Sequence, residues 1–238
     1  MHHHGTISNG KIVKAGNLGV KGFDLVGALK KEFSNSIIIR NDAKCAAMAE
    51  KVYGTMKDYS DGVFLCLGTG IGGAVFINGK LLEPKRYSGF EMGHIVLNKG
   101  GRLCTCGKRG CFETYASIKA LKTKVTETLD IDSDISGEYL REVILKEEVF
   151  EKHNEAVIQD VETFLDYLQT GICNFIDIFE PEIVVLGGSF SYYENNPIFK
   201  MLVDKINAPK TTFNEGEKPK IVTAQFKNDA GIIGATLI

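Results

Sequence analysis

A group of three cysteines and one histidine constrains this chain of 238 residues more than any other feature. Cys104, Cys106 and Cys111 share one short segment that contains two glycines, and His94 lies shortly before it. Because glycines permit a tight turn, the three thiolates can meet at one point, and the imidazole can supply a fourth ligand. Such a set suits tetrahedral zinc in a structural site, with all four positions filled by protein. The alternative, free thiols on a loop, would expose three cysteines to oxidation.

The overall composition is that of a globular protein without a nucleic-acid or membrane partner. Apolar residues make up 44% of the chain, which is enough for a substantial core. Lys and Arg total 28 against 30 Asp and Glu, and no basic block favours nucleic acid. The sequence has neither a transmembrane run nor a secretory signal, so we expect a cytoplasmic location. The opening Met1–His4 resembles a purification-tag remnant and is set aside.

The other three cysteines differ in kind from the clustered ones. Cys45, Cys66 and Cys173 lie in apolar stretches, so we expect them to be buried and unreactive. A disulfide framework is not expected in a cytoplasmic protein.

The first half of the chain is predicted to contain strands, one helix and two tight turns. Residues 35–42 (NSIIIRND) are predicted as a short buried strand, and residues 43–54 as a helix closed by a glycine. Residues 61–83 contain two apolar, β-rich runs separated by a glycine turn, followed by a hairpin turn at Asn78–Gly79.

The second half is predicted to be largely helical before the chain returns to strands. Helix-forming residues dominate 113–129 and 138–180. In the second range apolar residues recur at three- and four-residue steps, namely Val157, Val161, Phe164, Leu165 and Leu168. A buried strand in 181–190, a strand in 219–226 and the start of a helix in 229–238 complete a mixed α/β order.

The glycine-rich segment LGTGIGG is a candidate anion site. Between two strands, Gly68 to Gly73 and the Thr69 hydroxyl would let backbone N–H groups approach a phosphate closely. The segment is neither a Walker A loop nor a Rossmann fingerprint, because it lacks the Gly-Lys-Ser/Thr ending and does not open a helix. A plain tight turn is the alternative.

Asn41–Asp42 lies at the predicted junction of a strand and a helix. A carboxylate at the C-terminal end of a parallel strand lies where α/β sheets bind ligands, and it can accept a proton from a substrate hydroxyl. The alternative is a helix N-cap, which Asp and Asn often form.

Taken in order, NDA, LGTGIGG, GFEMGH, CTCGKRGCFETYAS and VVLGGSF resemble the ROK family of sugar kinases and sugar-responsive repressors. The resemblance extends from about Gly5 to the C-terminus. It implies an α/β, actin-like ATPase fold of the hexokinase and ribonuclease H-like type. Residues 5–40 would be the remainder of an incomplete N-terminal lobe, and residues 41–238 a sugar kinase domain with a zinc-binding loop at 94–111.

The same resemblance implies a role for each motif. Asp42 would be the general base for the attacking sugar hydroxyl, and His94 would use one ring nitrogen for zinc and the other for the sugar. The reaction would be in-line phosphoryl transfer from Mg²⁺-bound ATP to a hexose or N-acetylhexosamine, in a homodimeric protein. The implied sugar-binding residues are Asn41, Asp42, Glu91, His94 and Glu113, the zinc ligands are His94, Cys104, Cys106 and Cys111, and the nucleotide-binding residues are Gly68, Thr69, Gly70, Gly72, Gly73, Gly187 and Gly188.

Two departures from the family pattern modify these expectations. The family's first phosphate loop, Asp-x-Gly-x-Thr, is absent, so we expect this chain to be a poor kinase or none. Lys44 follows NDA where many relatives carry Asn.

Two other functions stay open. One is the sugar-sensing domain of a ROK transcriptional repressor, and the other is a sugar-binding module without turnover. Asp42 and the glycine segment favour the kinase, because a sensor must bind a sugar but needs neither of these features.

Overall fold

A mixed sheet of five strands forms the centre of the computed structural model, which describes residues 5–8, 10–15, 19–83, 90–208 and 218–237. The strands are β4 (Gly62–Leu67), β5 (Ile71–Ile77), β6 (Lys80–Leu81), β7 (Ile183–Gly188) and β8 (Lys220–Thr223), in the order β6-β5-β4-β7-β8. β4 pairs antiparallel with β5 and parallel with β7. The predicted hairpin and the strands in 181–190 and 219–226 are therefore confirmed.

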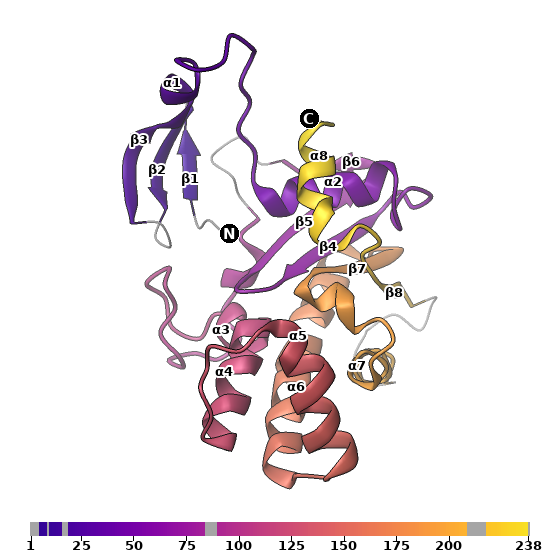
Figure 1. Cartoon of the computed structure of the whole chain (residues 1–238). Helices are drawn as coiled ribbons and strands as arrows, with labels where there is room; N and C mark the ends of the chain where they lie inside the picture. Colours follow the sequence, from indigo (N-terminus) through magenta and orange to yellow (C-terminus); the bar gives the residue numbers. More distant parts are fainter. Residues whose placement is uncertain (1–4, 9, 16–18, 84–89, 209–217, 238) are drawn as a thin grey trace.

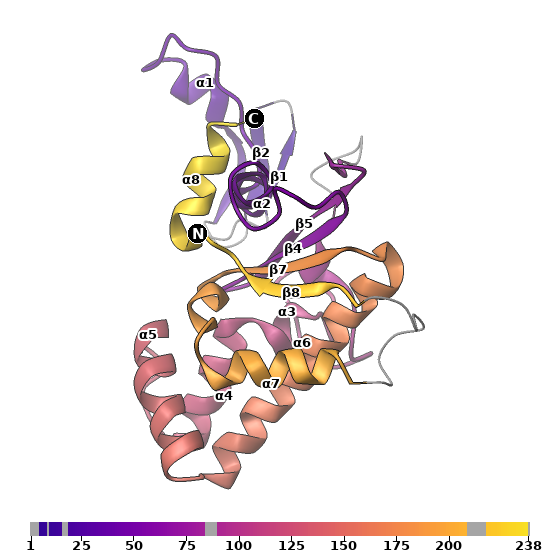
Figure 2. The ribbon, with the colours of Figure 1, turned by 90° about the vertical axis from the view of Figure 1, so that its right-hand side faces the viewer.

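Helices cover both faces of this sheet (Figures 1 and 2). On one face lie α2 (Asp42–Val52) and the short α8 (Ala230–Ala235). On the other lie α3 (Glu113–Ala116), α4 (Ile118–Leu129), α6 (Glu155–Phe179) and α7 (Pro197–Ile206).

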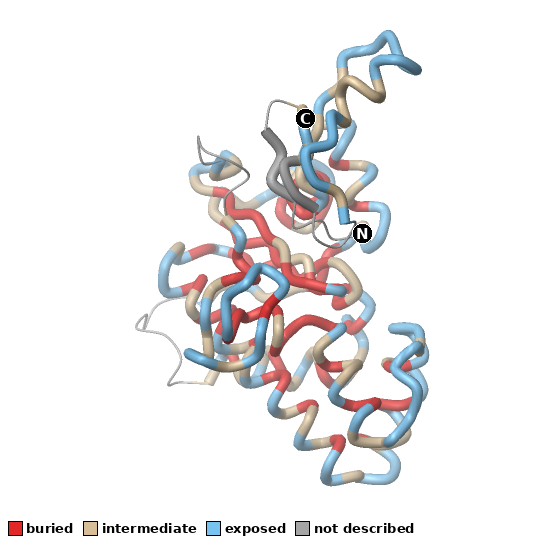
Figure 3. Tube along the Cα trace, turned by 90° about the vertical axis from the view of Figure 1, so that its left-hand side faces the viewer, coloured by how far each residue is buried: buried red, intermediate tan, exposed pale blue. Residues whose placement is uncertain are grey.

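The central strands are buried on both faces because two separate cores form. Val63 and Leu65 of β4 pack with α4 and α6, whereas Phe64 between them packs with the alanines of α2. Side chains alternate along a strand, so one apolar run serves both layers. Buried residues concentrate in this sheet and in the neighbouring helices (Figure 3).

The long helix α6 confirms the apolar period read from the sequence. All five of the predicted core residues on it are buried. The preceding helical stretch differs in detail, since α5 (Gly137–Tyr139) continues as π-helical turns at Leu140–Ile144 and Lys146–Glu151. Three short 3-10 helices, Met92–His94, Ser189–Tyr193 and Lys227–Asp229, complete the described helices. None of the described helices has the length and apolar character that crossing a membrane requires.

The N-terminal part forms a small, separate antiparallel sheet. Its strands are β1 (Gly5–Ser8), β2 (Lys11–Ala15) and β3 (Val20–Asp24), followed by α1 (Leu25–Leu29). Figure 1 shows this sheet standing away from the central one.

The predicted buried strand at 35–42 is wrong. Residues 35–41 form neither helix nor strand, and the Ile38 side chain is 63% exposed. An apolar, β-branched run becomes a strand only where a neighbour supplies hydrogen-bond partners. No strand among the described residues pairs with this segment.

Candidate functional site

Three segments that carry predicted site residues pack against the first residues of β5. The Ile71 N–H donates to the Glu113 carboxylate at 2.9 Å, which ties the start of α3 to the strand. A Cβ at Gly72 would lie 2.8 Å from the Cβ of Ala43 in α2. A Cβ at Gly93 would lie 2.2 Å from the Ile71 carbonyl oxygen. Three segments far apart in the sequence therefore contact two consecutive residues of one strand.

Each predicted sugar-binding residue lies on one of these three segments. Asn41 and Asp42 directly precede Ala43 in the sequence. Glu91 lies two residues before Gly93, and His94 directly follows it. His94 and Glu113 are buried, whereas Glu91 is exposed. The sequence contains no local signal for this convergence, because it results from packing around β5.

The start of α2 is capped by the asparagine, and the aspartate follows it. The Asn41 side chain accepts a hydrogen bond from the Lys44 N–H at 3.1 Å. Asp42 is the first helical residue, and one of its carboxylate oxygens accepts from the Ala43 N–H at 2.9 Å. A carboxylate in the first turn interacts favourably with the helix dipole. Asn41 thus fulfils the cap alternative, while the role of Asp42 as a base stays a prediction.

Lys44 places a buried cation next to this helix start. Lys44 is only 7% exposed. Burial lowers the pKa of its ammonium group, whereas the Glu83 and Glu91 carboxylates act to raise that pKa. Arg40 forms an ion pair with Glu83 at 2.9 Å. The departure from the family pattern therefore brings positive charge close to Glu91, one of the predicted sugar ligands.

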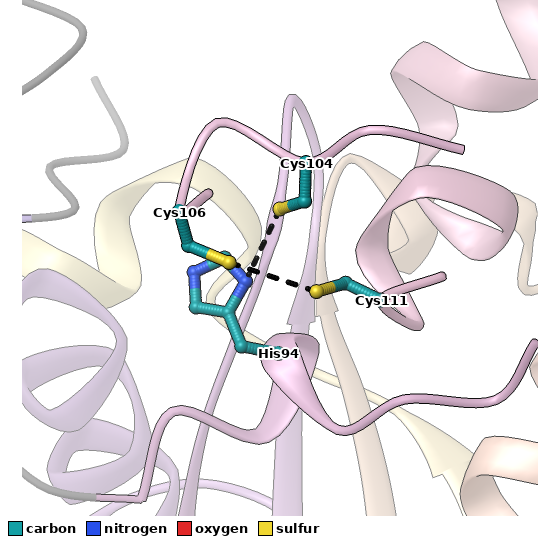
Figure 4. A group of neighbouring side chains, drawn as sticks. All are labelled: His94, Cys104, Cys106 and Cys111. Atoms are coloured by element: carbon teal, nitrogen blue, oxygen red, sulfur yellow. Dashed lines mark hydrogen bonds between the residues drawn. The ribbon is translucent and has the colours of Figure 1, made fainter. Parts of the chain in front are cut away.

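The cysteine and histidine cluster brings four possible metal ligands together. His94 Nδ1 lies 3.5 Å from Cys104 Sγ, Cys106 Sγ lies 3.6 Å from Cys111 Sγ, and the four ligand atoms lie within 4.8 Å of one another (Figure 4). Zinc–sulfur and zinc–nitrogen bonds of ordinary length give tetrahedral edges of about 3.5 to 3.8 Å. The donors fit zinc in kind, and the His94–Cys104 and Cys106–Cys111 distances match these edges. Because Nδ1 faces the cysteines, Nε2 is the nitrogen that can serve a second ligand.

The cysteine loop is tied to its surroundings by backbone contacts. The Lys108 ammonium donates to the His94 carbonyl at 2.8 Å, and the Arg102 N–H donates to the Tyr115 hydroxyl at 2.8 Å. Gly110 has a φ of +83°, and a Cβ there would lie 1.7 Å from the Asn98 carbonyl oxygen. Only glycine fits at this position, so the loop conformation is specified beyond its metal ligands.

Two of the three other cysteines match the expectation of burial. Cys45 and Cys173 are buried, and Cys66 is partly buried. Burial raises the pKa of the Cys66 thiol to about 12, with a further contribution from Asp42. This thiol stays protonated and unreactive near neutral pH.

The predicted glycine loop is shorter than the sequence indicates. Only residues 68–70 connect β4 to β5, because Ile71 already begins the strand. Gly72 pairs with Cys66 and Gly73 with Leu65 in the sheet, so the prediction of a loop through Gly73 is wrong. These two glycines permit close packing against α2 and Met92.

Two pockets flank the shortened loop, and α4 forms a wall of each. We call the larger, of about 440 Å³, the loop pocket; it is lined by Gly68, Thr69, Ile118, Lys119, Lys122, Thr123, Ser133, Asp134, Gly137 and Ser189. We call the other, of about 390 Å³, the cysteine-side pocket; it is lined by Thr69, Gly70, Arg102, Leu103, Thr105, Glu113, Thr114, Ser117, Lys119, Ala120, Thr123, Lys124 and Glu127. Both fall in the size range of ligand sites.

The paired glycines at the end of β7 pack against β4. A Cβ at Gly187 would lie 2.5 Å from the Phe64 ring, and one at Gly188 would lie 2.7 Å from the Leu67 carbonyl oxygen. Ser189, the next residue, lines the pocket. Sequence reasoning missed Ser189 and the lysines of α4, since nothing local to them marks a site.

Comparison with known proteins defines the class to which this fold and site belong. A Thermus thermophilus ROK hexokinase has a similar structure, with a TM-score of 0.77 and 27% identity, covering 92% of this chain and 70% of that one. The Thermotoga maritima glucokinase is 30% identical over 230 residues, or 90% of this chain and 69% of that protein. The Bacillus subtilis xylose repressor is 31% identical over 79% of this chain and 46% of that protein. The class is that of sugar kinases and sugar-responsive regulators with an actin-like ATPase fold.

Within this class, the chain belongs to the ROK family, whose model matches residues 1–238. The expected family and the α/β, actin-like fold are thereby confirmed, while the incompleteness of the N-terminal lobe stays a prediction.

Proposed function

We propose that this protein transfers a phosphoryl group from Mg²⁺-bound ATP to a hexose or N-acetylhexosamine, with Asp42 as the general base. The observation that carries the proposal is the convergence of three segments on Ile71 and Gly72, which supports a common site for Asp42, His94 and Glu113. The glycine loop leads directly into the same residues.

Each acceptor-side residue has a distinct task in this proposal. Asp42 accepts the proton of the attacking hydroxyl, and Asn41 beside it contacts the sugar. Glu91, the Nε2 of His94 and Glu113 bind the remaining hydroxyls. Zinc, held by His94 and the three cysteines, would fix the loop that carries them. Positioning of this kind supplies much of the rate in phosphoryl transfer.

The donor side uses the glycine loop and the loop pocket. The backbone N–H groups of Thr69 and Gly70 and the Thr69 hydroxyl face the phosphates, while the Gly68 N–H donates to the Gly70 carbonyl at 2.9 Å and holds the turn. The adenosine lies toward Ser189, which lines the loop pocket. Gly72, Gly73, Gly187 and Gly188 contribute by letting the surrounding segments pack closely. In this proposal the transferring phosphoryl group lies between the loop and Asp42.

The second candidate function is sugar sensing in a transcriptional regulator. The similarity to a xylose repressor over most of this chain favours it. A regulator would bind a sugar without ATP turnover. The homodimer and the cytoplasmic location stay predictions for either function.

A substrate panel tests the proposal. This chain, and a chain extended at its N-terminus by the Asp-x-Gly-x-Thr hairpin of a related glucokinase, are incubated with Mg²⁺, ATP and single hexoses or N-acetylhexosamines. Sugar phosphate is measured by mass spectrometry. We expect one or a few sugars to be phosphorylated, faster by the extended chain. Sugar binding without phosphate transfer in either chain would reject the kinase and support the sensor.

A further inference from the structure

We propose that Lys119 supplies the positive charge that the glycine loop lacks, and that its ammonium binds the phosphate tail of the nucleoside triphosphate. The inference rests on the proposed function, because it assumes that this loop faces a phosphoryl donor. A Walker A loop carries its own lysine. Residues 68–70 contain no charged side chain, so a cationic side chain that binds the phosphates must come from another element.

The first turn of α4 lies directly against the glycine loop. The Lys119 N–H donates to the Gly68 carbonyl at 3.2 Å. Ser117 caps the helix, with its hydroxyl accepting from the Ala120 N–H at 3.1 Å. These two contacts fix the Lys119 backbone beside the first glycine of the loop. The amino end of α4 carries partial positive charge, which adds to that of the ammonium.

Lys119 contributes to the walls of both pockets. Lys119, Thr123 and Thr69 line both the loop pocket and the cysteine-side pocket. Lys119 and Thr123 are four residues apart and lie on one side of the helix, so they form a ridge between the pockets. A phosphate held by the loop at Thr69 therefore lies next to this ridge.

The other cations around the pockets already have partners. Lys122 donates to the Ile135 carbonyl at 3.0 Å, and Lys124 lies 4.0 Å from both Glu127 and Asp160. Arg102 donates to the Thr114 carbonyl at 2.9 Å. Of the four cations that line the pockets, Lys119 alone has no hydrogen bond or ion pair from its side chain to the part of the chain that the structure describes.

An exposed lysine in this position suits a polyphosphate tail. Its ammonium is a compact charge with three donors on a flexible stem, so it can reach a phosphate that the rigid loop holds. Because the side chain has no partner to leave, binding breaks no existing ion pair. The contact is charge-assisted and therefore stronger than a neutral hydrogen bond.

The test measures nucleotide binding without turnover. Calorimetry gives the affinity of adenylyl imidodiphosphate with Mg²⁺ for the wild type, Lys119→Met, Lys119→Arg and the matched control Lys124→Met. Lys124 lies on the same helix but does not line the loop pocket. We expect Lys119→Met to weaken binding about tenfold, as loss of one charge-assisted contact does. Lys119→Arg and Lys124→Met should stay close to wild type.

Two further readouts separate a phosphate contact from a structural effect. Affinity for adenosine, which has no phosphate, and for the sugar should be unchanged in Lys119→Met. The nucleotide affinity of Lys119→Met should also fall less steeply with added salt than that of the wild type.

Some outcomes would overturn the inference. Wild-type affinity in Lys119→Met, an equal loss in Lys124→Met, or no nucleotide binding by the wild type would each do so. Nucleotide binding that depends on Lys119 in a protein that phosphorylates no sugar would instead reject the kinase proposal and keep this one.

Discussion

Replacing Gly72 by alanine tests how the site is assembled around β5. Gly72 does not have a left-handed φ, so its backbone accepts an alanine without strain. The added Cβ would lie 2.8 Å from the Cβ of Ala43, the residue that follows Asp42. The substitution therefore acts on the helix that carries the proposed base.

The size of the effect follows from this contact. Carbon atoms in contact are ordinarily about 3.5 to 4.0 Å apart, so the strand and α2 must separate by roughly 0.7 to 1.2 Å. Overpacking of this kind costs about 1 to 3 kcal/mol in the free energy of unfolding. A shift of about 1 Å at a catalytic group can lower the rate about a hundredfold. We therefore expect Gly72→Ala to lower the free energy of unfolding by about 1 to 3 kcal/mol and the rate of phosphoryl transfer by up to about a hundredfold.

A double-mutant cycle with Ala43→Gly provides the assay. Removing the Ala43 Cβ should relieve the clash, so Gly72→Ala combined with Ala43→Gly should recover stability and rate relative to Gly72→Ala alone. Urea denaturation and sugar phosphate formation are measured for all four proteins, and we expect a coupling energy of about 1 to 2 kcal/mol. Independent, additive effects would refute the packing argument. A loss confined to nucleotide affinity and not rescued would instead support the original prediction that Gly72 contacts phosphate.

Two further predictions concern groups that hold the site in place. Purified protein should contain one zinc per chain. A chelator should lower its melting temperature, because a structural metal site contributes folding free energy. Zinc retained in a Cys106→Ser, Cys111→Ser variant would show that the site is misassigned. Glu50→Ala should lower the free energy of unfolding by about 2 to 6 kcal/mol, because the fully buried carboxylate accepts from the Thr55 and Phe226 N–H groups at 3.0 and 2.8 Å. Glu50→Gln keeps one acceptor and should cost less in urea denaturation, and a loss below about 1 kcal/mol in Glu50→Ala would contradict this account.

The elements that sequence analysis found are those with strong local patterns. The period of α6 and the apolar runs of β4 and β7 depend on residues close together in the chain. The segment at 35–42 has an equally apolar run, but a strand also needs a partner, which no local pattern reveals.

The same distinction holds for the site. The candidate metal ligands from His94 to Cys111 are close in sequence, so their spacing alone predicts a metal centre. The packing of the segments that carry Asp42, His94 and Glu113 around β5 has no local sequence signal, and a shared site for these residues was implied only by the family resemblance. Lys119 was missed because its position relative to Gly68 results from the way α4 docks on the loop.

The most direct test of the proposed function is phosphoryl transfer by Asp42→Asn. The change is nearly isosteric and removes the proton acceptor, so sugar affinity should stay within a few-fold of wild type. Sugar phosphate formation is measured under single-turnover conditions in this chain and in the N-terminally extended chain, together with the sugar dissociation constant. We predict that the rate falls by about a hundredfold or more wherever the parent chain is active. Turnover by Asp42→Asn within a few-fold of its parent would contradict the assignment of Asp42 as the base.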